Sequence, residues 1–138
     1  MKNEGFLIKK GNFFGLFADP VPEYNGGLLI IAKEKQNIVD MNLEELMELG
    51  GIRRLARVMQ EIAYDGFPSN DYAIQTFREN QKRYPDTRYY LSLVPRKNVH
   101  ALVELATKIV GLNEDPKQVA ESMRNLYSKI KERMECIN

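Results

Sequence analysis

The stretch RYYLSLVPR, from Arg88 to Arg96, decides the fold of this 138-residue chain. Aromatic and aliphatic residues dominate its first seven positions, which predicts a β-strand, and Pro95 ends the strand because proline cannot donate a ladder hydrogen bond. Side chains on a strand alternate between the two faces of a sheet. One face carries the residues Tyr89, Leu91 and Leu93, which we expect to pack on the core. The other face carries Arg88, Tyr90 and Ser92, which either contact solvent or line a ligand site.

Four further apolar runs predict strands, and turn residues separate them. They are Gly5 to Lys9, Asn12 to Ala18, Leu28 to Ala32 and Tyr72 to Phe77. The dipeptide Asp19-Pro20 ends the second run, because proline restricts the residue before it and interrupts a ladder. The tripeptide Asn25-Gly26-Gly27 is a strong turn signal ahead of the third run. The segment from Arg78 to Asp86 is polar, contains a proline and predicts a loop.

A long helix is predicted to begin after Asn42. Glu45 lies three residues further on, which makes a capping-box pattern. The apolar residues that recur at helical spacing predict the buried face of this helix. They are Leu43, Met47, Gly51, Leu55, Val58, Met59 and Ile62. The pair Gly50-Gly51 costs about 1 kcal/mol per glycine relative to alanine, so we expect the helix to pack closely on the sheet there rather than to bend.

Two groups of side chains around this helix are assigned structural roles. The first turns contain Glu44, Glu45 and Glu48, which favour the positive end of the helix dipole. The methionines Met41, Met47 and Met59 follow the apolar pattern, so we assign them to the core rather than to a ligand site.

Two helices are predicted after residue 97. Asn98 caps the first and Gly111 ends it, while Asp115-Pro116 begins the second with proline at its favoured first position. The apolar face of the first contains Val99, Leu102, Val103, Ala106 and Val110. The apolar face of the second contains Val119, Met123, Leu126 and Ile130.

The order of these elements is strands, a helix, two strands and two helices. That order suits an antiparallel sheet with helices packed on it, which is the α+β class. A length of 138 residues fits one domain with one core. We therefore expect a single domain over residues 1–138, with the sheet and the long helix in 1–97 and a helical tail in 98–138.

Composition argues against several classes of function. A net charge of +1 argues against broad, charge-driven binding to nucleic acid or to an anionic membrane. Cys136 is the sole cysteine, so no intramolecular disulfide can form and a cytoplasmic setting is expected. One cysteine and one histidine match no structural zinc pattern. We therefore expect no metal site, no cofactor and no membrane span.

A local excess of basic residues lies between positions 78 and 97. This segment contains six basic residues and two acidic ones, Glu79 and Asp86, which gives it a net charge of +4. The six are Arg78, Lys82, Arg83, Arg88, Arg96 and Lys97. Arginine forks suit phosphate oxygens, so the cluster is either a solvated loop or part of a phosphate or nucleotide site.

The arrangement of these motifs resembles the core of the histidine-triad (HIT) superfamily. That family has a strand before Asp-x-x-Pro, a strand that ends near Pro-Lys, a long helix, and a strand that carries His-x-His-x-His before Pro-Arg. The matching pieces here are Phe17 to Pro20, Gly26 to Lys33, Asn42 to Leu46 and Leu93 to Arg96. The extension that ends in Asp115 to Leu126 is similar to the tail of the C-terminal half of galactose-1-phosphate uridylyltransferase.

The chain departs from the family at the positions of its chemistry. In register with Pro95-Arg96, the triad positions hold Arg88, Tyr90 and Ser92. The middle histidine is the family's nucleophile, whereas a tyrosine with a pKa near 10 is roughly 0.1% ionised at pH 7. A serine nucleophile would need a general base, and the motif offers none. His100, the sole histidine, lies near the start of a predicted helix and is assigned to the surface or helix end rather than to catalysis.

The resemblance therefore implies a degenerate HIT-like domain that is non-catalytic by the family mechanism and binds a nucleotide or a sugar phosphate. The candidate ligand-binding residues are Lys33, Gln75, Arg88, Tyr90, Ser92 and Arg96. One alternative is a nucleotidyltransferase or phosphoester hydrolase with altered catalytic residues, Tyr90 or Ser92. A second alternative is a protein-interaction or dimerisation module, because small histidine-triad proteins pair as homodimers.

Overall fold

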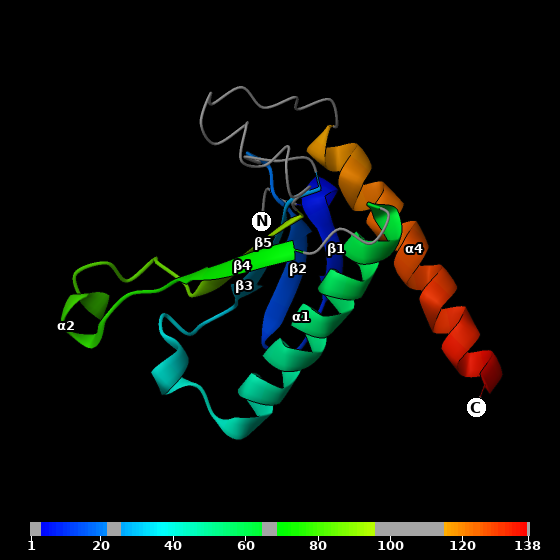
Figure 1. The fold of residues 1–138 in the computed structure, drawn as a ribbon. Coiled ribbons are helices and arrows are strands. Elements are labelled where there is room, and N and C mark those ends of the chain that lie inside the picture. The colour runs from blue at the N-terminus through cyan, green and yellow to red at the C-terminus, as the bar shows by residue number, and fades with distance from the viewer. Residues whose placement is uncertain (1–3, 22–25, 65–68, 96–114, 138) are drawn as a thin grey trace.

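The computed structural model describes residues 4–21, 26–64, 69–95 and 115–137 (Figure 1). The strands are β1 (Leu7–Lys10), β2 (Phe14–Ala18), β3 (Leu28–Ala32), β4 (Ser69–Ile74) and β5 (Tyr90–Pro95). The helices are α1 (Leu43–Ala63), α2 (Arg78–Gln81) and α4 (Pro116–Ile137), with short 3₁₀ turns η1 (Glu4–Phe6) and η2 (Ile38–Asp40). Within these ranges, no helix is both long enough and apolar enough to cross a membrane.

The five strands form one antiparallel sheet in the order β1-β2-β3-β5-β4. Helices α1 and α4 pack on one face of it, with α4 beside β1, and α2 lies away from the sheet (Figure 1). The predicted α+β class and the HIT-like arrangement of sheet and long helix are therefore confirmed. The helix predicted over residues 98–111 lies outside the described residues.

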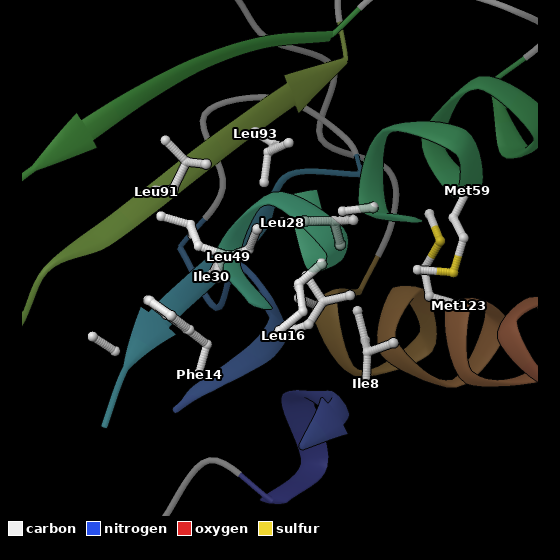
Figure 2. Packing of buried hydrophobic residues seen from close by; sticks show 14 of the residues in the cluster. Ile8, Phe14, Leu16, Leu28, Ile30, Leu49, Met59, Leu91, Leu93 and Met123 are labelled. Atoms are coloured by element: carbon white, nitrogen blue, oxygen red, sulfur yellow. The ribbon is translucent and has the colours of Figure 1, made fainter. Parts of the chain in front are cut away.

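The core lies between the sheet and the two long helices. Phe14, Leu16, Leu28, Ile30 and Leu93 are fully buried on the side of the sheet that faces α1. Met59 of α1 and Met123 of α4 point toward each other at one end of this cluster (Figure 2). The predicted core face of β5, with Tyr89 just before the strand, is confirmed, because Tyr89, Leu91 and Leu93 all belong to the cluster.

Most predicted elements agree with the structure, and two differ from it. Strand β3 matches its predicted bounds, and α4 begins at Pro116 with Val119 and Met123 buried as predicted. Strand β4 covers Ser69–Ile74 instead of 72–77, so its start was missed in a polar stretch that gave no alternating pattern. The predicted loop over 78–86 contains the one-turn helix α2.

The N-terminal half of α1 is fixed to the sheet by carboxylates. Asn42 and Glu45 form the predicted capping box, in which each side chain accepts a hydrogen bond from the other residue's backbone N–H. One turn further on, Glu48 accepts three backbone hydrogen bonds at the start of β2. Their donors are the N–H groups of Asn12 (2.8 Å), Phe13 (2.6 Å) and Phe14 (2.9 Å). Glu48 therefore fixes both the position of α1 and the path of the chain into β2.

The C-terminal half of α1 is fixed by Gln60, which is fully buried. Its Nε2 donates to the backbone oxygens of Gly26 and Leu93, each at 3.0 Å. Gly26 has a φ of 78°, and a Cβ there would lie 2.3 Å from the ring of Tyr64. The glycine of the predicted turn is thus required both by its backbone conformation and by close packing against α1.

The prediction of the buried face of α1 is wrong for most of its residues. The buried side chains are Glu45, Leu49, Ile52, Ala56, Met59 and Gln60. Leu43 and Met47 are instead 72% and 68% exposed, and Val58 and Ile62 are also exposed. The helix carries apolar residues on two opposite sides, and the hydrogen bonds of Glu48 and Gln60 turn the less obvious side inward. The assignment of Met47 to the core is wrong for the same reason.

The prediction that Gly50-Gly51 packs closely on the sheet is also wrong. Both glycines are exposed, and a Cβ at either position would meet no atom within 4 Å. The helix continues through the pair without interruption. Contacts among the described residues therefore give no reason for two glycines at the middle of this helix.

We predict that Glu48→Ala lowers the free energy of unfolding by about 2 kcal/mol, because three backbone N–H groups lose a charged acceptor. Chemical denaturation monitored by circular dichroism measures the change. The matched control is Glu44→Ala, which removes an exposed carboxylate on the same helix that has no hydrogen-bond or ion-pair partner among the described residues. Equal stability of the two variants would contradict the anchoring role of Glu48.

Candidate functional site

The face of the sheet opposite α1 carries two parallel rows of side chains, which we call the open face. Residues paired directly across antiparallel strands point to the same side. The first row, from β4 to β1, is Tyr72, Ser92, Leu29, Phe17 and Leu7. The second row is Ile74, Tyr90, Ile31, Gly15 and Lys10. The open face thus combines hydroxyl groups toward β4 with apolar and basic side chains toward β1.

An open hollow of about 320 Å³ lies at the β4 side of these rows, and we call it the hydroxyl hollow. Its polar lining comes from Asp19, Tyr72, Tyr90 and Ser92. Leu29, Ile31 and Val21 supply the apolar part. The Asp19 side chain also accepts a hydrogen bond from the N–H of Val21 at 2.9 Å, which fixes the carboxylate beside the end of β2.

A second open hollow, of about 510 Å³, lies toward β1, and we call it the basic hollow. Its charged lining consists of Lys10, Lys33, Asp86 and Arg88. Leu7, Gly15, Phe17, Ile31 and Ala32 supply its apolar part. Ile31 lines both hollows, so the two share one apolar floor.

Contacts with the backbone fix the two predicted cations of the basic hollow. Arg88 donates from Nε to the backbone oxygen of Lys33 (3.1 Å) and from Nη1 to those of Pro85 and Thr87 (both 2.8 Å). Lys33 donates from Nζ to the backbone oxygen of Gly11 (2.5 Å). Arg88 and Lys33 therefore have structural partners as well as a place in the hollow.

The surroundings of Tyr90 in the hydroxyl hollow favour its neutral form. Burial raises the pKa of Tyr90 above its ordinary value. The nearby phenolate of Tyr72 and carboxylate of Asp19 raise this pKa further, because a second negative charge beside them is unfavourable. Phenolate at position 90 is then scarcer at pH 7 than in free tyrosine. This environment suits a hydroxyl that donates or accepts a hydrogen bond better than it suits a nucleophile.

The remaining predicted site residues do not join these hollows within the described residues. Gln75 lines neither of them, and its Oε1 accepts a hydrogen bond from the N–H of Ile38 at 3.1 Å. Arg78 of the basic cluster forms an ion pair with Asp40 (3.2 Å). Arg96 and His100 lie outside the described residues.

Four polar residues that line the hollows were not predicted from the sequence: Asp19, Tyr72, Lys10 and Asp86. Asp19 was assigned to the end of a strand, although its place beside proline in the family motif was a usable signal. Tyr72 and Lys10 join the open face only through cross-strand register, which one strand alone does not reveal.

Comparisons with known proteins identify the fold. No family model and no curated protein matches the sequence. Among solved structures, an ADP-glucose phosphorylase from Arabidopsis thaliana with bound ADP-glucose has 21% identity and a TM-score of 0.72 over 86% of this chain and 39% of its own. A uridylyltransferase mutant has 14% identity and a TM-score of 0.77 over 94% and 45%.

A shorter protein matches over most of its own length as well. It is a zinc-bound histidine triad family protein from Mycobacterium smegmatis, with 19% identity and a TM-score of 0.65 over 92% of this chain and 86% of its own. The chain thus spans less than half of the two longer proteins and nearly the whole of the small one. The chain therefore has the HIT-like fold, in the form that uridylyltransferases and histidine triad proteins share.

Proposed function

We propose that the open face binds a nucleotide or a sugar phosphate without the covalent chemistry of the histidine triad. One observation carries the proposal: cations at one end and hydroxyl groups at the other end share an apolar floor. Lys10, Lys33 and Arg88 supply the cations, and Tyr90 and Ser92 supply hydroxyl groups.

Each part of such a ligand has a chemical counterpart on this face. Phosphate oxygens suit the ammonium and guanidinium groups of the basic hollow. Sugar hydroxyls suit the carboxylate of Asp19 and the hydroxyl of Ser92 in the hydroxyl hollow. A base or the apolar side of a sugar ring suits Ile31 and Phe17. The ADP-glucose bound to the similar phosphorylase supports this class of ligand.

The residues of this chain support the absence of triad chemistry. The sequence has one histidine, His100, so it cannot supply three. Burial raises the pKa of Tyr90, at the position that the resemblance gives to the nucleophile, and so favours the neutral phenol further. A neutral phenol is a poor nucleophile toward phosphorus, and its activation would need a base or a metal ion.

An altered hydrolase or nucleotidyltransferase is a second candidate function, and Asp19 favours it. This carboxylate lines the same hollow as Ser92 and Tyr90, where it could accept a proton from a serine nucleophile. A homodimeric interaction module is a further candidate, favoured by the exposed apolar side chains of α1.

Calorimetric titration tests ligand binding directly. We expect heat with at least one of three ligand classes, namely nucleoside monophosphates, nucleotide sugars such as ADP-glucose, and dinucleoside polyphosphates. Lys33→Gln should raise the dissociation constant about tenfold or more, because it removes a cation from the phosphate. Lys129→Gln, an exposed lysine of α4, is the matched control and should bind normally. No heat and no thermal shift at millimolar ligand would contradict the proposal.

The raised pKa of Tyr90 leads to a second prediction, which concerns how folding stability depends on pH. Because its folded-state pKa is raised, the protonated phenol contributes stability below about pH 10 that is lost as pH rises through the folded pKa. Wild type should therefore lose stability relative to Tyr90→Phe above that pH, as measured by thermal unfolding. A stability difference that stays constant through this range would refute the raised pKa.

Assays for turnover of the same ligands distinguish the non-catalytic binding domain from the altered enzyme. The non-catalytic proposal predicts no product from any of them, by chromatography, in wild type, Tyr90→Phe and Ser92→Ala alike. Turnover that Ser92→Ala or Asp19→Asn abolishes would favour the altered enzyme instead. Turnover unchanged in Tyr90→Phe and Ser92→Ala would remove both residues as nucleophiles.

A further inference from the structure

The side of helix α1 that faces away from the sheet carries a cluster of arginines, and we call this side the α1 outer face. An open hollow of about 630 Å³ lies over it, and every residue that lines the hollow belongs to α1. Its charged lining consists of Arg53, Arg54, Arg57 and Glu61. Three guanidinium groups against one carboxylate give the hollow a net charge of +2.

Two of these arginines are not neutralised by a bonded carboxylate. Arg53 forms a hydrogen-bonded ion pair with Asp71 of β4. The hydrogen bond from Arg53, and then the charges of Arg53 and Arg57, lower the pKa of Asp71. Arg57 therefore attracts Asp71 without bonding to it, and Arg54 has no hydrogen-bond or ion-pair partner among the described residues. Arg54 and Arg57 can thus bind carboxylates of another molecule.

The glycine pair leaves a gap in the side chains of this face. Gly50 lies three, four and seven residues before the arginines, so it shares their side of the helix. A Cβ at Gly50 or Gly51 would meet no atom within 4 Å, although each glycine costs about 1 kcal/mol relative to alanine. The gap allows the backbone of a second helix to approach α1 closely beside the arginines.

Apolar side chains extend the face on both sides of the glycine pair. Leu43 and Met47 are exposed before it, and Val58 is exposed after it. From Leu43 to Val58 the helix rises about 22 Å, which is about four turns. A partner that covers this length needs apolar side chains opposite Leu43 and Met47 and negative charges opposite the arginines.

We propose that the α1 outer face is a docking surface for an acidic amphipathic helix of another protein. Arginine pairs with carboxylates through two parallel hydrogen bonds. Arg53 and Arg57 lie four residues apart, and Arg54 and Arg57 lie three apart, so carboxylates at the same helical spacings can face them. Apolar anchors at helical spacing then fix the partner along the exposed side of α1.

The charge and shape of the face favour this partner over two others. A second copy of the chain brings the same positive hollow, in which Glu61 is the sole carboxylate, so an acidic helix complements the arginines better. A lipid surface is flat, whereas a gap at the middle of the face suits the convex backbone of a helix.

Fluorescence anisotropy with a panel of labelled synthetic helices tests the charge complementarity. Each peptide carries leucine at one end and glutamate at the other end of a single helical face, and the register varies across the panel. At least one should bind the full chain at micromolar concentration. Its counterpart with glutamine in place of glutamate should bind at least tenfold more weakly.

Charge reversal on α1 locates the binding. Arg54→Glu/Arg57→Glu should abolish binding of the glutamate peptide and bind its lysine counterpart instead. The matched control is Lys129→Glu/Lys131→Glu, which reverses two exposed lysines of α4 and should bind the glutamate peptide normally. The proposal is overturned if no glutamate peptide binds at millimolar concentration, or if both charge variants bind equally well.

A glycine variant tests the close approach. Gly50→Gln fills the gap and leaves all three arginines in place. Glutamine favours a helix over glycine, so the melting temperature should not fall, whereas peptide binding should weaken about tenfold. Ser128→Gln, at an exposed position of α4, is the matched control and should bind normally. Undiminished binding by Gly50→Gln would show that no backbone approaches at this position.

Two further measurements distinguish the other occupants. Co-sedimentation with phosphatidylserine vesicles that Arg54→Glu/Arg57→Glu abolishes would assign the face to lipid, and a dimer that the same variant dissociates would assign it to a second copy. Either result would overturn the acidic helix. Titration of this variant with ADP-glucose should match wild type, because the open face lies on the other side of the sheet, so this proposal and the ligand proposal fail independently.

Discussion

Two polar side chains set the rotation of α1 on the sheet, and most of the structure depends on that rotation. Glu48 accepts hydrogen bonds from the start of β2, and Gln60 donates to the backbone at Gly26 and Leu93. A helix held at both points can present only one side to the sheet. Leu49, Ile52 and Ala56 therefore enter the core, and Leu43 and Met47 stay outside.

The same geometry determines where a ligand can bind. Helices α1 and α4 cover one face of the sheet, so strand alternation directs Tyr90, Ser92 and Ile31 to the other. Because the strands are paired in register, hydroxyl groups from β4 and β5 and the ammonium group of Lys10 on β1 fall on two neighbouring rows. The chemistry of the open face is thus a consequence of register rather than of any single motif.

Much of the fold could be predicted from the sequence because its signals are local. The alternation in RYYLSLV, the capping box at Asn42 and the proline of α4 each depend on a few neighbouring residues. The buried side of α1 could not be predicted, because it depends on hydrogen bonds between residues more than thirty positions apart. Four residues that line the hollows, Lys33, Arg88, Tyr90 and Ser92, were named as candidates from the sequence, but Tyr72 and Lys10 needed the pairing of strands.

Backbone amide shifts in an NMR titration with ADP-glucose or a nucleoside monophosphate test the account most directly. If the open face binds the ligand, the shifts should concentrate on the outward-facing positions of β2, β3 and β5, around Phe17, Ile31 and Ser92. The amides of α1 around Arg54 should not move. Shifts confined to α1, or no shifts at millimolar ligand, would contradict the assignment of the open face as the binding site.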